Sequence, residues 1–214
     1  MLGVTFGDKH SFHELGLWLK KYPEITPPVP KTKFVEVMGA DGALDLSKVQ
    51  TGFIQYNRRT ITMEFSILGE RETWPEKHSE IMDLLHGEEM DLILDDDPLF
   101  CYTGRLSVSG FDPQKVTSGV TIVMNAEPYK TRIEATTQSF TVSGSLAATI
   151  EGDRMPVIPT ITASSSMQMT FGGIAYSLAA GENILPDVII RKGSNTFTFE
   201  GDGTVAFEYR EGRF

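Results

Sequence analysis

The stretch of sequence that decides the fold runs from Trp74 to Ser109 and reads WPEKHSEIMDLLHGEEMDLILDDDPLFCYTGRLSVS. An amphipathic helix is predicted at its start, because three apolar side chains and one histidine recur at the i, i+4, i+7 and i+11 spacing of one helical face. Those positions are Trp74, His78, Ile81 and Leu85. Thr73 and Glu76 have the spacing of a capping box, and Pro75 falls in the first turn, where its missing N–H is harmless. Gly87 is expected to end the helix in a left-handed conformation.

A β-hairpin is predicted directly after this helix. Met90, Leu92 and Leu94 alternate with Asp91 and Ile93, which is strand spacing, and residues 100–108 return with a second apolar face. The segment Asp95-Asp96-Asp97-Pro98 between them has turn chemistry, since short acidic side chains bond their own backbone and proline fixes φ. We interpret this acidic turn as solvated.

The acidic turn does not have the spacing of a metal site. An EF-hand loop needs a glycine at its sixth position and a glutamate at its twelfth. Counting from Asp95, these positions hold Phe100 and Leu106. His10 and His13 lie three apart, but the sequence offers no third ligand beside them. We therefore predict no metal and no cofactor.

Composition limits the classes of function. The chain has 214 residues, one cysteine and a net charge of −10, so it can bury a core without disulfides and cannot form a thiolate zinc site. The single thiol, Cys101, falls in a predicted strand and is expected to be packed and inert. Nucleic-acid binding neutralises phosphates with Lys and Arg, so no sequence-specific nucleic-acid binding is predicted. An acid excess is compatible with DNA passing nearby, because it repels phosphates.

The character of the chain changes after about Lys130. Before it lie strands such as 60–68 and 120–126, whose apolar and polar residues alternate so that one face is buried. After it, Thr, Ser, Gly and Ala dominate, and hairpins are predicted around Gly172-Gly173 and around Glu200-Gly201-Asp202-Gly203. Short strands with Gly-rich turns indicate a sandwich or jelly roll. We predict a mainly β protein with an N-terminal β-sandwich domain that carries the helix, residues 1–130, and a C-terminal β-sandwich domain, residues 131–214.

A proline-rich segment between Lys20 and Lys33 is a candidate for contact with another copy of the chain. Four prolines within residues 23–30 forbid a helix and favour extended polyproline geometry. One interpretation is a surface loop, and the other is an arm that lies on a neighbouring subunit. The candidate interface residues are Pro23, Ile25, Pro27, Pro28, Val29 and Pro30.

The sequence contains no recognisable catalytic or targeting motif. Neither a nucleophile elbow of the form Gly-x-Ser-x-Gly nor a phosphate-binding loop is present. Residues 1–8 lack the charged and apolar parts of a signal peptide, and no run approaches the roughly 20 apolar residues of a membrane span. Trp18 and Trp74 could stack on sugars, but both lie in apolar patterns and are expected in the core. An enzyme, such as a cell-wall hydrolase, is not predicted.

Six short segments spread over the chain carry a family resemblance. They are Gly42-Ala43-Leu44-Asp45-Leu46-Ser47, Tyr56-Asn57-Arg58-Arg59-Thr60-Ile61-Thr62-Met63-Glu64-Phe65, Leu85-His86-Gly87, Leu94-Asp95-Asp96-Asp97-Pro98, Gly193-Ser194-Asn195-Thr196-Phe197 and Tyr209-Arg210-Glu211-Gly212. In this order they resemble the distal tail (Dit) proteins of long-tailed siphophages over nearly the whole chain.

The resemblance implies an N-terminal ring-forming domain and a C-terminal galectin-like domain without catalytic residues. It implies a homohexamer at the tail tip of the virion, assembled in the host cytoplasm, with DNA passing through its centre. The implied partners are the tail tube protein, the tail-associated tip protein and a receptor-binding protein of the baseplate, without membrane insertion. The alternative is a carbohydrate-binding module that recognises host cell-wall polysaccharide. Its candidate residues are Tyr176, Phe197 and Tyr209, which alternation predicts to point inward.

Overall fold

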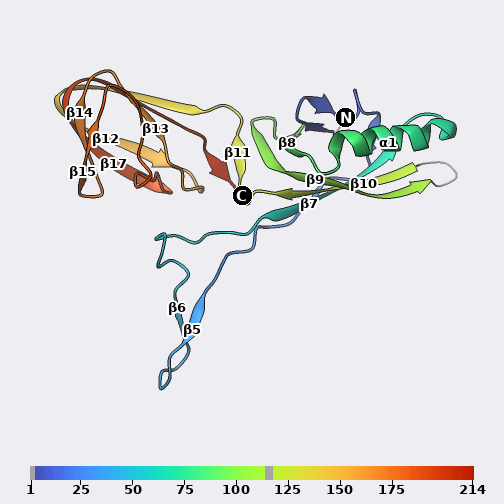
Figure 1. Cartoon of the computed structure of the whole chain (residues 1–214), viewed down its shortest axis with the longest axis horizontal. Helices are drawn as coiled ribbons and strands as arrows, with labels where there is room; N and C mark the ends of the chain where they lie inside the picture. The colour runs from blue at the N-terminus through green and yellow to red at the C-terminus, as the bar shows by residue number, and fades with distance from the viewer. Residues whose placement is uncertain (1–2, 114–117) are drawn as a thin grey trace. The chain divides into compact units, whose positions relative to one another are not determined.

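The computed structural model of the chain describes residues 3–113 and 118–214 and confirms a mainly β fold (Figure 1). Within these residues, one α-helix accompanies the strands. The chain divides into two compact units, Met1–Lys130 together with Phe214, and Thr131–Arg213. Each unit has a hydrophobic core of its own, which is the property of an independently packed domain.

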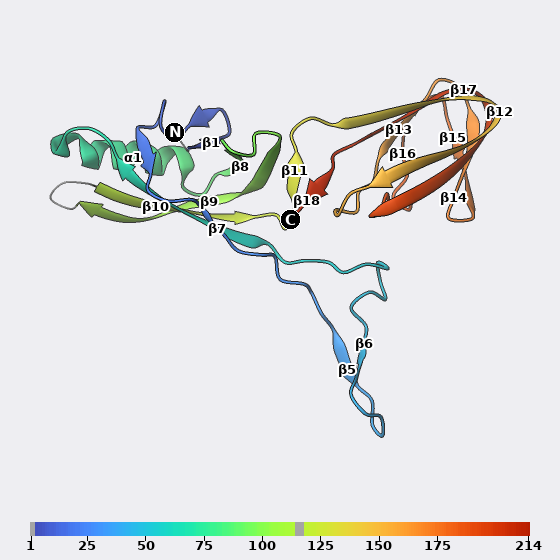
Figure 2. The same ribbon diagram turned by 180° about the vertical axis from the view of Figure 1, so that it is seen from behind.

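The first unit is built on a curled antiparallel sheet with the strand order β2-β1-β8-β9-β10-β7-β3. Its strands are Val4–Phe6 (β1), Lys9–His10 (β2), Leu17–Leu19 (β3), Arg59–Ile67 (β7), Glu89–Leu94 (β8), Phe100–Pro113 (β9) and Ser118–Ala126 (β10). The strands predicted at 60–68 and 120–126 are confirmed as β7 and β10, which pair along their whole length (Figure 2). Alternate side chains of both strands are buried, so one face of the sheet forms the core.

The predicted helix is confirmed as Trp74–Leu85 (α1). Three residues of its predicted stripe are buried in the core, namely Trp74, Ile81 and Leu85. The fourth, His78, is half-buried, and its ring lies tilted against the ring of Phe111, with 4.5 Å between the ring centroids. Gly87 follows the helix with a φ of 87°, as its predicted role requires.

The start of the helix differs from the prediction. Pro75 lies in the first turn as expected, but Thr73 makes no capping hydrogen bond. Instead, Thr73 ends a short 3-10 turn, Arg71–Thr73 (η1), and its hydroxyl donates to the C=O of Glu70 at 2.8 Å. The capping box is therefore wrong, because the preceding turn already engages the hydroxyl that would have capped the helix.

The predicted hairpin after the helix is confirmed as β8 and β9. The buried residues of its apolar face are Leu92, Leu94, Tyr102, Leu106 and Val108. Cys101 is buried in β9, as expected of a packed thiol. At Gly104 an added Cβ would lie 2.6 Å from the Cα of Ala126, so glycine lets β9 and β10 approach each other.

The second unit is organised by two strands of 17 residues each, Thr136–Gly152 (β12) and Gly193–Tyr209 (β17), which pair along their whole length. β17 also pairs with Met167–Phe171 (β14) through residues 197–200 and with Thr160–Ala163 (β13) through residues 205–208. Ile174–Leu178 (β15) and Gly181–Ile184 (β16) lie beyond β14 and β13. The long strand pair thus joins the β14–β15 part of the curled sheet to its β13–β16 part. The short strands Lys130–Arg132 (β11) and Gly212–Arg213 (β18) flank this unit in sequence.

The hairpin predicted around residues 200–203 is wrong. These residues lie inside β17 and pair with residues 142–145 of β12. Gly201 and Gly203 have φ values of 140° and 141°, which side-chain-bearing residues rarely adopt. The two glycines bend one continuous strand between its β14 half and its β13 half instead of reversing it. The hairpin predicted around Gly172-Gly173 is confirmed as β14 and β15.

An asparagine locks the loop that leads into β17. The side-chain NH2 of Asn195 donates to three backbone C=O groups, those of Arg191, Gly193 and Ile150, at 2.7, 2.8 and 3.2 Å. Its Oδ1 accepts the N–H of Arg191 at 2.9 Å. Asn183 makes the equivalent set of bonds in the loop that leads into β16. The second unit therefore uses the motif Gly-x-Asn twice, each time to fix a loop before a strand.

Candidate assembly site and the polar network of the first unit

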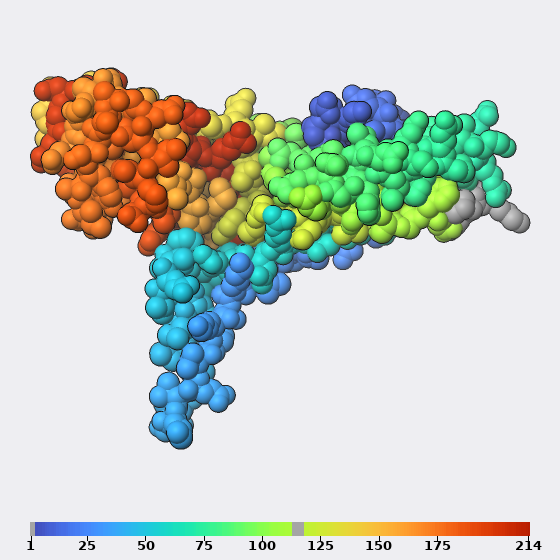
Figure 3. Space-filling model, in the orientation of Figure 1, coloured from blue at the N-terminus to red at the C-terminus, as the bar shows by residue number. Residues whose placement is uncertain are grey.

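A long hairpin leaves the sheet of the first unit, and we call its residues 31–55 the hairpin arm. Its strands, Phe34–Glu36 (β5) and Ala43–Asp45 (β6), pair only with each other among the described strands. Figure 3 shows the arm, in blue and cyan, standing clear of the sheet of its unit. Its exposed apolar side chains are Phe34, Val35, Val37, Met38, Leu44 and Val49. Monomers rarely expose contiguous apolar patches that have no function, so the arm is a candidate contact surface.

The proline-rich segment, for which a surface loop and an interface arm were the two interpretations, leads directly into this arm. It runs along the sheet of its own unit, because Glu24–Ile25 (β4) pairs with β7. Pro23 and Pro28 are buried, Ile25 is half-buried, and Pro27, Val29 and Pro30 are exposed. The exposed end of the segment is continuous with the exposed arm. Its role at a subunit interface stays a prediction.

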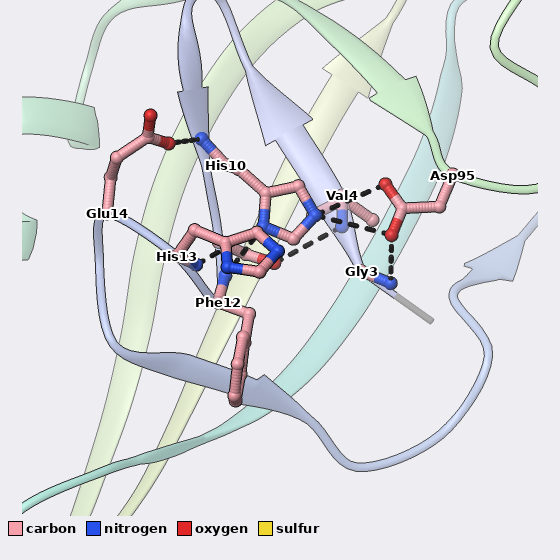
Figure 4. A network of polar contacts seen from close by, with 8 residues as sticks. Gly3, Val4, His10, Phe12, His13, Glu14 and Asp95 are labelled. Carbon is pink, nitrogen blue, oxygen red and sulfur yellow. Dashed lines mark hydrogen bonds and ion pairs between the residues drawn. The ribbon is translucent and has the colours of Figure 1, made fainter. Parts of the chain in front are cut away.

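A polar network fixes the first described residues of the chain (Figure 4). Asp95 accepts the N–H of Gly3 at 2.8 Å, and its carboxylate oxygens lie 3.2 and 3.3 Å from Nε2 of His10. The other ring nitrogen of His10, Nδ1, accepts the N–H groups of Phe12 and His13 at 3.1 and 3.3 Å. Because Nδ1 accepts, neutral His10 carries its proton on Nε2, facing Asp95. No group of three ligating side chains that could hold a metal occurs in residues 3–113 and 118–214.

The acidic turn does more than reverse the chain. Asp95 holds the network just described, and Asp97 forms an ion pair with Lys130 at 2.7 Å. Burial raises the pKa of the Tyr22 hydroxyl above its ordinary value, and the nearby Asp96 carboxylate adds to that shift. The three carboxylates thus act on three separate segments of the unit. The prediction of a solvated turn is confirmed, because Asp95 and Asp96 are exposed. Tertiary contacts add partners for these carboxylates that the local sequence does not show.

A groove of about 710 Å³ lies between α1 and residues 13–16. Its charged lining residues are of both signs, namely Lys9, Glu14, Lys77, Glu80 and Asp83. None of these side chains is buried.

The aromatic residues considered for sugar binding belong to the core of the second unit. Phe197 and Tyr209 are buried, and Tyr176 is partly buried against the same core. Their predicted inward orientation is therefore confirmed. A side chain in the core cannot stack on a sugar ring, so neither Phe197 nor Tyr209 supports the carbohydrate-binding alternative. Tyr176 packs part of its side chain against the same core.

The two tryptophans differ in their surroundings. Trp74 is 4% exposed, as predicted, whereas Trp18 is 42% exposed. The expectation of a buried Trp18 is wrong, because its neighbours Leu17 and Leu19 both turn into the core. Successive residues of a strand face opposite sides, so Trp18 must face away from that core.

No family model and no curated protein matches the chain. Among solved structures, the chain is similar to the Dit protein (gp 19.1) of SPP1, which is described as a paradigm of the hub adsorption apparatus in phages that infect Gram-positive bacteria. The TM-score is 0.72, the likeness covers 100% of both chains, and the sequences are 13% identical. No helix of the described residues is long and apolar enough to cross a membrane. The likeness to the SPP1 protein over the full length shows that the chain has the fold of a phage distal tail protein.

Proposed function

We propose that this protein is the distal tail protein of a phage or prophage, a hexameric ring hub at the tail tip. The ring would join the tail tube to the baseplate and its receptor-binding apparatus, and its centre would be the channel for DNA. The observation that carries this proposal is the hairpin arm, whose apolar side chains stand exposed on the single chain.

The arm points to a second copy of the chain as its occupant. Apolar side chains such as Phe34 and Met38 gain free energy only when another surface removes them from water. In a closed ring each copy places its arm on one neighbour and receives the arm of the other, so every arm is covered. The fold shared with the Dit protein of SPP1 over the full chain supports this arrangement.

The charge of the chain suits a conduit for DNA. With a net charge of −10 the protein repels phosphates, so DNA would pass without being retained. Tight binding would need clustered Lys and Arg that release counterions, and the sequence has no basic run longer than two residues.

The function proposed is structural and not enzymatic. The groove beside α1 has no buried ionisable group, and the shared fold is that of a structural hub. The partners would be the tail tube protein, a tail-associated tip protein and a receptor-binding protein, and the place of the protein would be the virion tail tip.

The test is the oligomeric state of the purified chain, measured by native mass spectrometry and by light scattering across a concentration series. We expect a species of six times the 23.7 kDa chain. Met38→Asp places a charge on the fully exposed apolar tip of the arm and is expected to shift the population to monomer. Ile174→Asp is the matched control, because Ile174 is an exposed apolar residue of the second unit.

The two parts of the proposal fail separately. A chain that stays monomeric at every concentration would contradict the ring. If the chain forms a hexamer and Met38→Asp leaves it intact, the ring stands, but the arm is not part of the interface between subunits. Equal weakening by Met38→Asp and Ile174→Asp would show a nonspecific effect of charge and would likewise remove the arm.

A further inference from the structure

The two backbone legs of the hairpin arm are joined at its root. Lys31 N–H donates to the C=O of Gln55, and Asn57 N–H donates to the C=O of Val29, both at 2.8 Å. Pro30 and Tyr56 form a β-bridge between these bonds. Any contact made by Tyr56 therefore acts on the position of the whole arm.

Arg59 connects this root to a segment far away in sequence. Its side chain is buried, with 6% exposed, and its Nε–H donates to the C=O of Thr26 at 2.9 Å. Its Nη1 donates to the C=O of Pro128 at 3.4 Å, and its guanidinium lies 5.5 Å from the ring centroid of Tyr102. One side chain thus holds the segment that enters the arm and the segment that ends the first unit.

Burying the Arg59 guanidinium costs free energy of hydration, which contacts in the folded chain must offset. Burial lowers its pKa, because removal from water disfavours the charged guanidinium. No ion pair joins Arg59 to a carboxylate in the described ranges of the chain. Among the described residues, the C=O groups of Thr26 and Pro128 and the ring of Tyr102 stabilise the charge. The planar guanidinium can engage all three groups together, whereas the ammonium group of a lysine cannot.

An aromatic group joins the same two segments a second time. The Tyr56 and Tyr129 ring centroids are 6.0 Å apart, and Phe214 contacts both rings. Phe214 stacks on Tyr129 at 4.9 Å with 9° between the planes and meets Tyr56 edge-on at 4.7 Å. Next to this group, Arg58 forms an ion pair with Glu127. The Tyr56–Tyr129 contact and the Arg58–Glu127 ion pair link residues beside the arm with residues 127–130, and Phe214 bridges Tyr56 and Tyr129.

We propose that Arg59 and the aromatic group of Tyr56, Tyr129 and Phe214 form a clasp that couples the hairpin arm to residues 127–130. Thr131, where the second unit begins, follows this segment directly. Since the clasp contacts are shared, displacing the arm displaces the start of the second unit, and the coupling is reciprocal. When a second copy of the chain binds the arm, the clasp would shift residues 127–130, which directly precede the second unit in sequence. It rests on contacts within one chain and does not depend on the number of subunits in the ring.

The test is amide hydrogen exchange of Phe214→Ala measured on the monomeric Met38→Asp background. Phe214 is 40% exposed, so its removal should leave the core intact. Loss of its ring contacts is expected to speed exchange of the Lys31 and Asn57 amides about threefold to tenfold. Phe12→Ala is the matched control, because Phe12 also contacts two rings, those of His13 and Trp18, and lies outside the root.

Arg59→Lys tests the second half of the clasp and its reciprocity. Lysine keeps the charge but loses the fork, so exchange is expected to rise at Asn57 and also at Glu127, whose N–H donates to the C=O of Thr103 at 2.8 Å. Unchanged exchange at Lys31 and Asn57 in Phe214→Ala would overturn the proposal. An equal rise throughout β7 and β10, or the same rise in Phe12→Ala, would also overturn it, because the effect would then be general loss of stability.

Discussion

Replacing Asn195 by alanine should destabilise the second unit far more than the same change at Asn183. The two side chains make the same bonds: the NH2 of Asn183 donates to the C=O groups of Ala179, Gly181 and Ile161 at 2.9, 3.0 and 3.3 Å. Their burial differs, since Asn195 is 7% exposed and Asn183 is half-buried at an edge of the sheet. Comparing the two substitutions therefore shows how burial changes the contribution of one hydrogen-bond pattern to the stability of the second unit.

The expected magnitudes follow from what each substitution leaves behind. A net hydrogen bond is worth about 1 kcal/mol, and a buried polar group without a partner costs about 1–3 kcal/mol. Asn195→Ala removes the side-chain donor of one buried and two part-buried hydrogen bonds and should cost about 3 kcal/mol. At Asn183 water can replace the lost bonds, so Asn183→Ala should cost about 1 kcal/mol.

The measurement is exchange of the slowest amides of β17, whose rates report the free energy of opening of this unit. About 3 kcal/mol corresponds to exchange that is faster by about a hundredfold, and about 1 kcal/mol to about fivefold. Asn195→Asp should be at least as damaging as the alanine, because it aims a carboxylate at carbonyl oxygens. Equal effects of Asn183→Ala and Asn195→Ala would refute the argument that burial decides the cost.

Three further predictions concern the tryptophans, a tyrosine and the proline-rich segment. Trp74→Ala should cost about 3–5 kcal/mol and Trp18→Ala less than about 1 kcal/mol in urea unfolding; a reversed order would contradict the assignment of Trp18 to the outer face. Burial raises the pKa of Tyr209 and Glu211 adds to it, so neutral Tyr209 contributes stability that is present below about pH 10 and lost as the pH rises through the folded value. Above about pH 10 the wild type should therefore lose thermal stability more steeply than Tyr209→Phe, with Tyr176→Phe as control, and identical slopes would argue against it. Val29→Ser should weaken the hexamer without unfolding the chain, and an unchanged mass at every dilution would remove the proline-rich segment from the interface.

Periodic patterns within one segment correctly predicted the helix and the strands whose buried face repeats regularly along the sequence. Helical spacing from Trp74 to Leu85 predicts which face of α1 packs in the core, and the alternation in β7 does the same for that strand. The capping box at Thr73 failed although its spacing was right, because spacing does not show whether another carbonyl already engages the hydroxyl. The Gly-x-Asn motif is visible in the sequence at residues 181–183 and 193–195, but its spacing does not show that each asparagine binds backbone C=O groups.

By itself, the sequence determined a mainly β chain with one helix, the buried faces of β7 and β10, and a family resemblance that the shared fold supports. Only the tertiary structure decided that Gly201 and Gly203 bend a strand instead of closing a hairpin, because pairing with β12 is a long-range choice. It also decided the partners of the acidic turn and the meeting of Arg59 with Pro128. The physical reason is the same in each case: periodicity records which side of an element meets the core, whereas the partner of a polar group or a strand edge depends on segments that lie far apart in the chain.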